Sequence, residues 1–260
     1  MEKSIGQTQY QELVQWQHPR DSKLTWSYVK HKGPHKSNDR DDCVVVAPII
    51  NKDSEPEIVF ESHIRPPRMS RANSGITIEP VGGLATDKAA NGGLEQNAKR
   101  ELEEEMGLKV SKMHQPLENI PGDVGAMDGS CSIFVAECEG KVKPKENDES
   151  ELAIFSVPLK DSIKYLLDAT KRGVDVTTVS IIGALNALKE LKIQPEFDGA
   201  IPKPKLLWSA IDNNPNAMQQ DGLAALKRKT EFLPEAAVSK KKPSSFLSKI
   251  WGWFKSLFSR

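Results

Sequence analysis

The segment from Leu94 to Gly107 restricts the folding of this chain more than any other. Its apolar side chains recur at every fourth position, which is the spacing of one buried face of an α-helix. These residues are Leu94, Ala98, Leu102 and Met106. Gly107 follows them, and glycine commonly ends a helix. We therefore expect an amphipathic helix with one face in a core.

The polar face of this predicted helix carries three glutamates. Glu101, Glu104 and Glu105 have the spacing i, i+3 and i+4, so one side of an α-helix presents all three. Clustered carboxylates repel one another, and a hard divalent cation such as Mg²⁺, which takes oxygen ligands, would relieve the repulsion. Arg100 lies four residues before Glu104 and can pair with it. A solvated helix face is the simpler alternative.

Runs of apolar and β-branched residues predict a sheet beside this helix. The run Cys43–Ile50 is continuously apolar, as expected of a strand buried on both faces. Residues 57–61 are its expected hairpin partner. Further strands are predicted at residues 76–79, 132–136 and 152–157, helices at 161–169 and 177–191, and a short strand or two before residue 41.

Two segments before the helix are candidates for contact with a ligand. Proline lacks an amide donor, so residues 65–68 are predicted to form a loop from which Arg65 and Arg68 project. Gly82 and Gly83 end the strand at 76–79, and glycine allows the backbone to approach another group closely.

The order of strand, glycine turn, loop and helix resembles a known family. Residues 100–108 read Arg-Glu-Leu-x-Glu-Glu-x-Gly-Leu, which resembles the second half of the Nudix hydrolase signature at every defined position. Residues 64–67 and 78–84 look like the preceding elements of the ADP-ribose pyrophosphatase branch. The first half departs from the pattern, because Gly92 stands where the family has a glutamate, for which Glu95 is a partial substitute.

The resemblance implies a fold and a division of the chain. The expected fold is α/β, a Nudix α/β/α sandwich with a mixed β-sheet. It would occupy residues 42–193, after an N-terminal strand and loop extension at 1–41. An irregular, proline-containing arm at 194–243 and an amphipathic C-terminal helix at 244–260 would follow.

The resemblance also implies a reaction. The expected activity is Mg²⁺- or Mn²⁺-dependent hydrolysis of a nucleoside diphosphate sugar, with ADP-ribose, split into AMP and ribose 5-phosphate, as the best candidate. The implied metal ligands are Glu101, Glu104, Glu105 and a carbonyl near Gly82 or Gly83. The implied catalytic residues are Glu104, Arg100 and a loop base, for which Glu149 is preferred over Glu146 and Glu151. Solvated loop charges are the alternative for these three glutamates.

Arg65, Glu79 and Gly83 are the candidates for substrate binding. A guanidinium can form a bidentate contact with phosphate or stack on a base, although a surface arginine is the simpler reading of Arg65. Glu79 can receive a ribose hydroxyl or a metal-bound water, or it can be a salt-bridge partner at a strand end. The glycine-containing loop 121–129 would contact the distal part of the substrate.

Charge distribution limits the partners of the chain. Nine lysines and arginines against two glutamates from Lys227 onward give this part +7 and leave −7 for the rest, so nucleic acid is not an expected partner. Cys43, Cys131 and Cys138 lack paired CxxC spacing and are expected to be reduced core residues. His63 and His114 are expected to be structural. Residues 1–16 lack an apolar secretion-signal region, so we expect a cytoplasmic protein.

The last seventeen residues predict attachment to a membrane surface. On a helix their apolar side chains fall within an arc of about 160°, and a lysine run precedes them. This composition is typical of a helix lying on anionic lipid. The apolar residues are Phe246, Leu247, Ile250, Trp251, Trp253, Phe254, Leu257 and Phe258. Docking on the protein itself or in a partner groove is the alternative.

Two other functions stay open. Gly92 in place of glutamate is compatible with a non-hydrolytic Nudix module that binds a nucleotide or a protein. Alternatively, the C-terminal helix is a membrane-targeting or lipid-perturbing element that a Nudix-like domain carries. The resemblance also makes a homodimer an expected assembly, because this branch is often dimeric.

Overall fold

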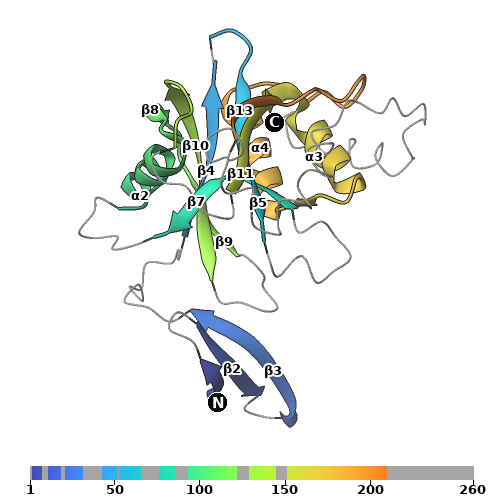
Figure 1. Ribbon diagram of the computed structural model, residues 1–260. Helices are drawn as coiled ribbons and strands as arrows, with labels where there is room; N and C mark the ends of the chain where they lie inside the picture. Colours follow the sequence, from blue (N-terminus) through green and yellow to red (C-terminus); the bar gives the residue numbers. More distant parts are fainter. Residues whose placement is uncertain are drawn as a thin grey trace, which may run out of the picture.

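Two separate sheets form the described part of the protein (Figure 1). The computed structural model describes residues 2–7, 11–18, 21–31, 43–51, 53–65, 76–85, 93–121, 129–144 and 151–209. The N-terminal sheet is antiparallel and contains β1 (Glu2–Gln7), β2 (Gln11–His18) and β3 (Asp21–His31). The sequence predicted one or two strands here, so the extension holds more regular structure than expected.

The larger sheet is mixed and ten-stranded. Its strands are β4 (Cys43–Ile50), β5 (Glu57–Ile64), β6 (Ile76–Glu79), β7 (Val81–Leu84), β8 (Lys109–Met113), β9 (Leu117–Pro121), β10 (Ser130–Glu139), β11 (Glu151–Pro158), β12 (Asp175–Val176) and β13 (Lys205–Ser209). The pairs β4–β10 and β6–β12 are parallel, and the others are antiparallel.

Helical segments cover both faces of this sheet (Figure 1). They are α2 (Gly93–Glu101), the π-helical η1 (Leu102–Met106), the 3₁₀ turn η2 (Leu159–Asp161), α3 (Ser162–Lys171) and α4 (Thr178–Glu190). On β4, Ala47 and Ile49 pack toward α3 and α4, while Val44 and Val46 pack toward α2 and η1. This alternation explains why the Cys43–Ile50 segment is apolar throughout.

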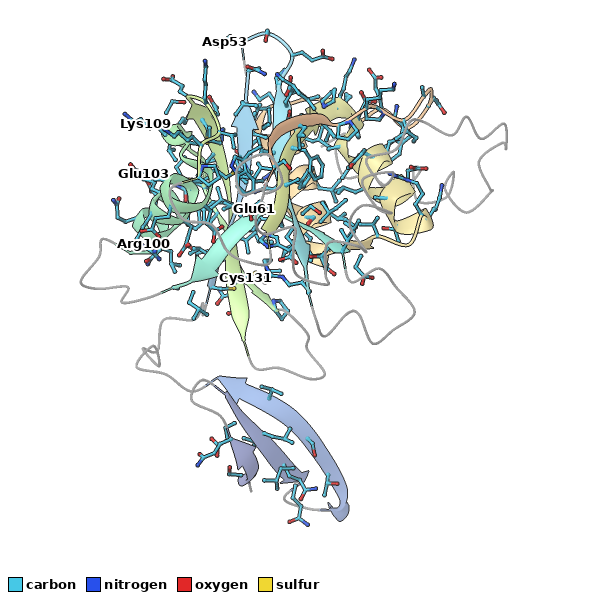
Figure 2. The ribbon with its side chains drawn as sticks, in the orientation of Figure 1. Asp53, Glu61, Arg100, Glu103, Lys109 and Cys131 are labelled. Carbon is cyan, nitrogen blue, oxygen red and sulfur yellow. The ribbon has the colours of Figure 1, made fainter. Side chains whose placement is uncertain are left out.

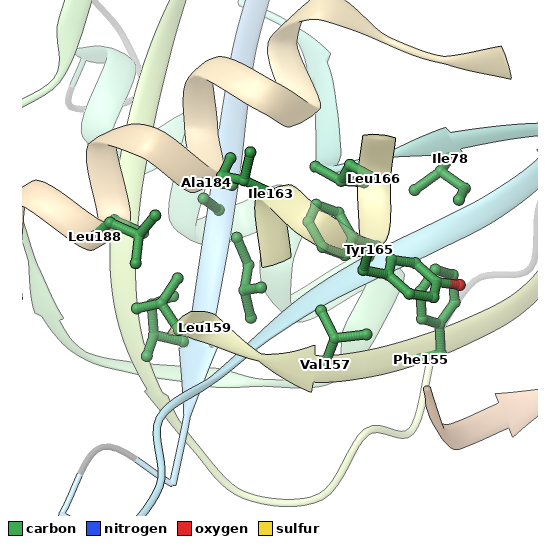
Figure 3. Packing of buried hydrophobic residues seen from close by; sticks show 14 of the residues in the cluster. Ile78, Phe155, Val157, Leu159, Ile163, Tyr165, Leu166, Ala184 and Leu188 are labelled. Atoms are coloured by element: carbon green, nitrogen blue, oxygen red, sulfur yellow. The ribbon is translucent and has the colours of Figure 1, made fainter. Parts of the chain in front are cut away.

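The core against α3 and α4 is the larger one (Figure 3). Phe155 lies between Phe60 and Tyr165, with ring centroids 6.0 and 5.7 Å away. Leu166 from α3 and Leu188 from α4 are fully buried in the same cluster. These apolar contacts hold the two helices on the sheet.

Strand β4 changes neighbours along its length, which positions the glycine segment. It pairs with β5 only at Ile49 and Ile50, and its first four residues pair with β7 instead. Residues 57–61 therefore form a strand as predicted, but most of β5 pairs with β6 and β11. The predicted glycine turn is part of β7, which pairs with β4 and contacts α2.

Most elements agree with the sequence patterns. The predicted strands at 43–50 and 76–79 are confirmed, and β10, β11, α3 and α4 contain or nearly match the other predicted segments. Residues 205–209, predicted to be irregular, form β13 because they pair with β11. The structure shows a mixed α/β fold. None of the helices within the described ranges is long and apolar enough to span a bilayer.

Candidate functional site

The helix with the glutamates changes its geometry halfway. It is α-helical in α2 and becomes π-helical in η1, from Leu102 to Met106. Gly107 ends it with a φ of 67°, and its N–H donates to the carbonyls of Leu102 and Glu103. The segment is therefore helical as predicted, but its α-helical geometry ends at Glu101. Single π-turns are rare, and they frequently lie at functional sites.

The apolar stripe predicted for this segment is confirmed. Ala98, Leu102 and Met106 have no exposed surface, and Leu94 packs partly buried at the edge of the same cluster. The stripe fixes the segment on the sheet, so its remaining side chains have defined positions. Figure 2 labels Arg100 and Glu103 on it.

Arg100 joins two of the three predicted ligands. Its Nη1 donates to Glu104 Oε2 and its Nη2 to Glu101 Oε1, which confirms the predicted Arg100–Glu104 pair. Burial alone would lower the pKa of Arg100, but the adjacent carboxylates outweigh this and raise it. Glu101 is only 7% exposed. Arg100 therefore neutralises a nearly buried carboxylate.

Both glycines of β7 lie where a side chain does not fit. A Cβ added at Gly83 would overlap the Glu101 carboxylate, lying 2.7 Å from Oε2. A Cβ added at Gly82 would lie 2.6 Å from the carbonyl oxygen of Val44. The predicted close approach of the backbone is thus present, and the group approached at Gly83 is a candidate metal ligand.

The three predicted metal ligands are not assembled as one group. Among the described residues, no three His, Cys, Asp or Glu side chains are arranged to hold a metal ion. Arg100 occupies the space between Glu101 and Glu104. Glu105 lies partly buried in the π-turn. Metal binding by Glu101, Glu104, Glu105 and the Gly82 region stays a prediction.

Arg65 and Glu79 form a second polar group. Arg65 Nε and Nη2 donate to the two carboxylate oxygens of Glu79 at 2.9 and 2.8 Å, and Thr77 Oγ1 donates to Oε1. Burial would raise the pKa of Glu79, but the hydrogen bonds from Arg65 and Thr77 outweigh it and lower that pKa. Arg65 therefore does not simply project from a loop, and Glu79 is the strand-end salt-bridge partner that was the alternative expectation.

The sequence interpretation missed a buried acid–base pair beside this group. His63 Nε2 lies 3.1 Å from Glu61 Oε2, and both side chains are buried. Glu61 faces Glu79 across the β5–β6 ladder, and His63 faces Thr77. Figure 2 labels Glu61 near the middle of the sheet. Charged residues alternating with buried Ile58 and Phe60 were the signal that could have revealed the pair.

The Arg65–Glu79 group, the Glu61–His63 pair and the Arg100–Glu101–Glu104 group all belong to the α2 side of the sheet. Val59 packs in the α2 cluster, so alternation along β5 places Glu61 and His63 on that side too. Glu79 ends β6, and only Pro80 separates it from β7, which carries Gly83 to Glu101. A short continuous segment thus links the Arg65–Glu79 group to the Arg100–Glu101–Glu104 group.

Several predicted residues lie outside the described part. These are Arg68, Gly92, Glu146, Glu149, most of the loop 121–129 and the C-terminal helix 244–260. Glu151 begins β11, and its backbone is paired with His63. Glu151 is the first described residue after the segment that carries Glu146 and Glu149.

Comparison with known proteins gives no assignment. The chain matches no family model and no curated protein. The resemblance to Nudix hydrolases therefore depends on the motif at residues 100–108 and on the segments that precede it.

Proposed function

We propose that this protein is a Nudix-type hydrolase that splits the diphosphate bond of a nucleoside diphosphate sugar with Mg²⁺ or Mn²⁺. ADP-ribose is the best single candidate, and its products would be AMP and ribose 5-phosphate. One observation supports this most strongly. Arg100, Glu101 and Glu104 stand at defined positions of the motif and form one hydrogen-bonded group where α2 passes into η1, with Glu101 against the backbone of Gly83.

The carboxylates of Glu101 and Glu104 fit a hard divalent cation. Both already bind one guanidinium, so they can share a positive charge. Gly83 keeps the space beside Glu101 clear of side-chain atoms. Glu105 and a carbonyl of Gly82 or Gly83 would supply further oxygen ligands. When bound, Mg²⁺ would neutralise charge on the diphosphate and activate the attacking water.

Arg100 has a positioning role in this proposal. It limits the movement of Glu101 and Glu104, because one planar group binds both. Its positive charge also offsets the mutual repulsion of the two carboxylates.

Arg65 and Glu79 are proposed to bind the nucleotide part of the substrate. The Arg65 side chain is 41% exposed, so a phosphate or a base can reach it while Glu79 holds it in place. The lowered pKa keeps Glu79 ionised at neutral pH, as an acceptor for ribose hydroxyls. Glu61 faces Glu79 across the β5–β6 ladder, His63 faces Thr77, and the two support this group from the sheet.

Glu149 is still the preferred base for activating water, with Glu146 and Glu151 as alternatives. The support is the family resemblance and the place of these residues in the sequence, at or just before the start of β11, whose first residue, Glu151, pairs with His63.

A substrate panel tests the proposal. Purified full-length protein is incubated with several nucleoside diphosphate sugars and with Mg²⁺ or Mn²⁺, and phosphomonoester products are quantified. We expect paired monophosphates from at least one substrate, with ADP-ribose the fastest. Absence of metal-dependent release from every substrate would refute the hydrolase.

A non-hydrolytic nucleotide-binding module is the second candidate. It is favoured by Gly92 at the usual glutamate position. Metal-dependent nucleotide binding by calorimetry, without any product, would select it.

We also propose peripheral membrane attachment through residues 244–260, based on their segregated apolar and basic side chains. Co-sedimentation with anionic liposomes compares the full chain with one ending at Val238. We expect only the full chain to sediment. Equal sedimentation of both would show that the helix is not the anchor.

A further inference from the structure

Two cysteines begin neighbouring parallel strands. Cys43 is the first residue of β4, and Cys131 is the second residue of β10. They are direct partners in the β4–β10 register. Both belong to the small apolar cluster that also contains Val45 and Ile133 and lies against α4 residues. Their side chains therefore project to the same side of the sheet, next to each other.

The strand geometry allows a bond between them. Adjacent strands lie about 4.7–4.9 Å apart, and disulfides join Cα atoms about 4.4–6.8 Å apart. The thiol of Cys43 is also directed toward β10, since its Sγ lies 3.8 Å from the carbonyl oxygen of Ser130. Ser130 is the residue immediately before Cys131. The Cys43 thiol therefore already lies against the backbone of its partner strand.

The two thiols differ in exposure in a way that suits stepwise oxidation. Cys43 is partly exposed, so a small oxidant can reach it, whereas Cys131 is only 4% exposed. Redox-sensitive cysteines are commonly accessible and adjacent to a second, resolving cysteine.

We propose that Cys43 and Cys131 are a reversible redox site, in which a peroxide drives formation of a disulfide between β4 and β10. The Cys43 sulfur attacks one oxygen of hydrogen peroxide, the O–O bond breaks, and Cys43 sulfenic acid and one water form. The Cys131 sulfur then attacks the Cys43 sulfur and displaces the hydroxyl group as a second water. Two thiols lose two electrons and two protons, and one peroxide is reduced to two waters.

This bond would lie close to the glycine strand. Cys43 pairs with Leu84 at the end of β7, and β7 carries Gly83 to Glu101. Formation of the disulfide does not depend on hydrolase activity, so the two proposals fail separately.

Cys138 is a matched control on the same strand. It lies in the cluster on the opposite side of the sheet, 7% exposed. Burial raises the pKa of Cys138 to about 12, so this thiol is almost entirely protonated at neutral pH. It should neither initiate the reaction nor enter the bond.

The test uses the folded full-length protein. Wild type, Cys43→Ser, Cys131→Ser and Cys138→Ser are treated with hydrogen peroxide at neutral pH, remaining thiols are alkylated, and unreduced peptides are mapped by mass spectrometry. We expect a peptide linking Cys43 to Cys131 in wild type and Cys138→Ser, lost after treatment with a thiol reductant. Neither Cys43→Ser nor Cys131→Ser should give it.

Three results would overturn the proposal. Cys43 could oxidise to sulfinic acid without a link to Cys131, a link could join two copies of the chain, or Cys138 could enter disulfides as readily as Cys131. Circular dichroism of each variant before oxidation identifies any loss of folding. Cys43→Ser is the safest variant in this respect, because the side chain it changes is only partly buried.

Discussion

On the side of the sheet covered by α3 and α4, the strands bury a large cluster of apolar side chains, centred on Phe155. On the side covered by α2 and η1, a smaller apolar cluster is joined by buried Glu61, His63 and Glu101. The first side gains stability from burial of apolar surface. On the second side, the buried carboxylates of Glu61 and Glu101 also need polar partners, because burying an unpaired charge is costly. Stability and candidate chemistry are thus concentrated on opposite sides of one sheet.

The largest expected effect comes from a cavity on the apolar side. Leu166→Ala should lower the free energy of unfolding by about 2–5 kcal/mol, because it removes a fully buried side chain. Urea denaturation measures the change. Leu206→Ala is the control, since Leu206 is 45% exposed, and its cost should stay within about 0.5 kcal/mol. Similar losses in both variants would contradict a stability that depends on the buried cluster around Leu166.

The next effect is expected on the polar side. Gly83→Ala forces the Glu101 carboxylate out of its position, so metal-dependent hydrolysis should fall about tenfold or more. Product formation at saturating Mg²⁺ measures this. Gly6→Ala is the control, because its new methyl group would have its nearest neighbour, Leu13 Cβ, 4.0 Å away. Unchanged activity in Gly83→Ala would show that Glu101 is not needed where it lies.

Glu79→Gln should give a smaller, pH-dependent loss. The pKa of Glu79 is lowered from 4.5 in the folded protein, so ionised Glu79 contributes stability above pH 4.5, and this contribution disappears as the pH falls through the folded pKa. We expect a loss of about 1–3 kcal/mol at neutral pH and a clearly smaller loss at about pH 3. Urea denaturation at both pH values measures it.

Glu55→Gln is the matched control for this change, because Glu55 is 65% exposed in its ion pair with Lys160. It should change stability little at either pH. A loss for Glu79→Gln that does not depend on pH would argue against a stabilising ionised pair.

The smallest effect is expected at the margin of the apolar side. Glu190 on α4 contacts His114 at 3.3 Å and Lys189 at 3.2 Å. Burial would raise the pKa of Glu190, but these partners lower it. Because Glu190 lies at the surface and is only partly buried, Glu190→Gln should cost about 0.5 kcal/mol or less by urea denaturation. If Glu190→Gln lowered the free energy of unfolding as much as Leu166→Ala, a charged contact would contribute as much stability to this side as a buried apolar side chain, against this account.

Local patterns predicted much of this structure. The β-branched run of β4, the apolar stripe of α2 and η1, and the Arg100–Glu104 pair all follow from spacing along a single element. Such features depend on neighbours a few residues away, so the sequence is sufficient to predict them.

Other features depend on pairing between distant segments. The place of the Glu61–His63 pair beside Glu79 and Thr77 depends on the register between β5 and β6. Likewise, β13 exists because Lys205–Ser209 pairs with β11. The end of the π-turn also contacts a distant segment, since the Lys143 N–H donates to the Met106 carbonyl. No local propensity encodes these contacts.

The most direct test of the central claim compares two neighbouring glutamates of η1. Glu104 binds Arg100 and stands at a defined position of the motif, whereas Glu103 is exposed and stands at an undefined one. Release of AMP from ADP-ribose with Mg²⁺ is measured for wild type, Glu104→Gln and Glu103→Gln. We predict metal-dependent release by wild type, near-normal release by Glu103→Gln, and a loss of about a hundredfold or more in Glu104→Gln. Full activity of Glu104→Gln would contradict the account.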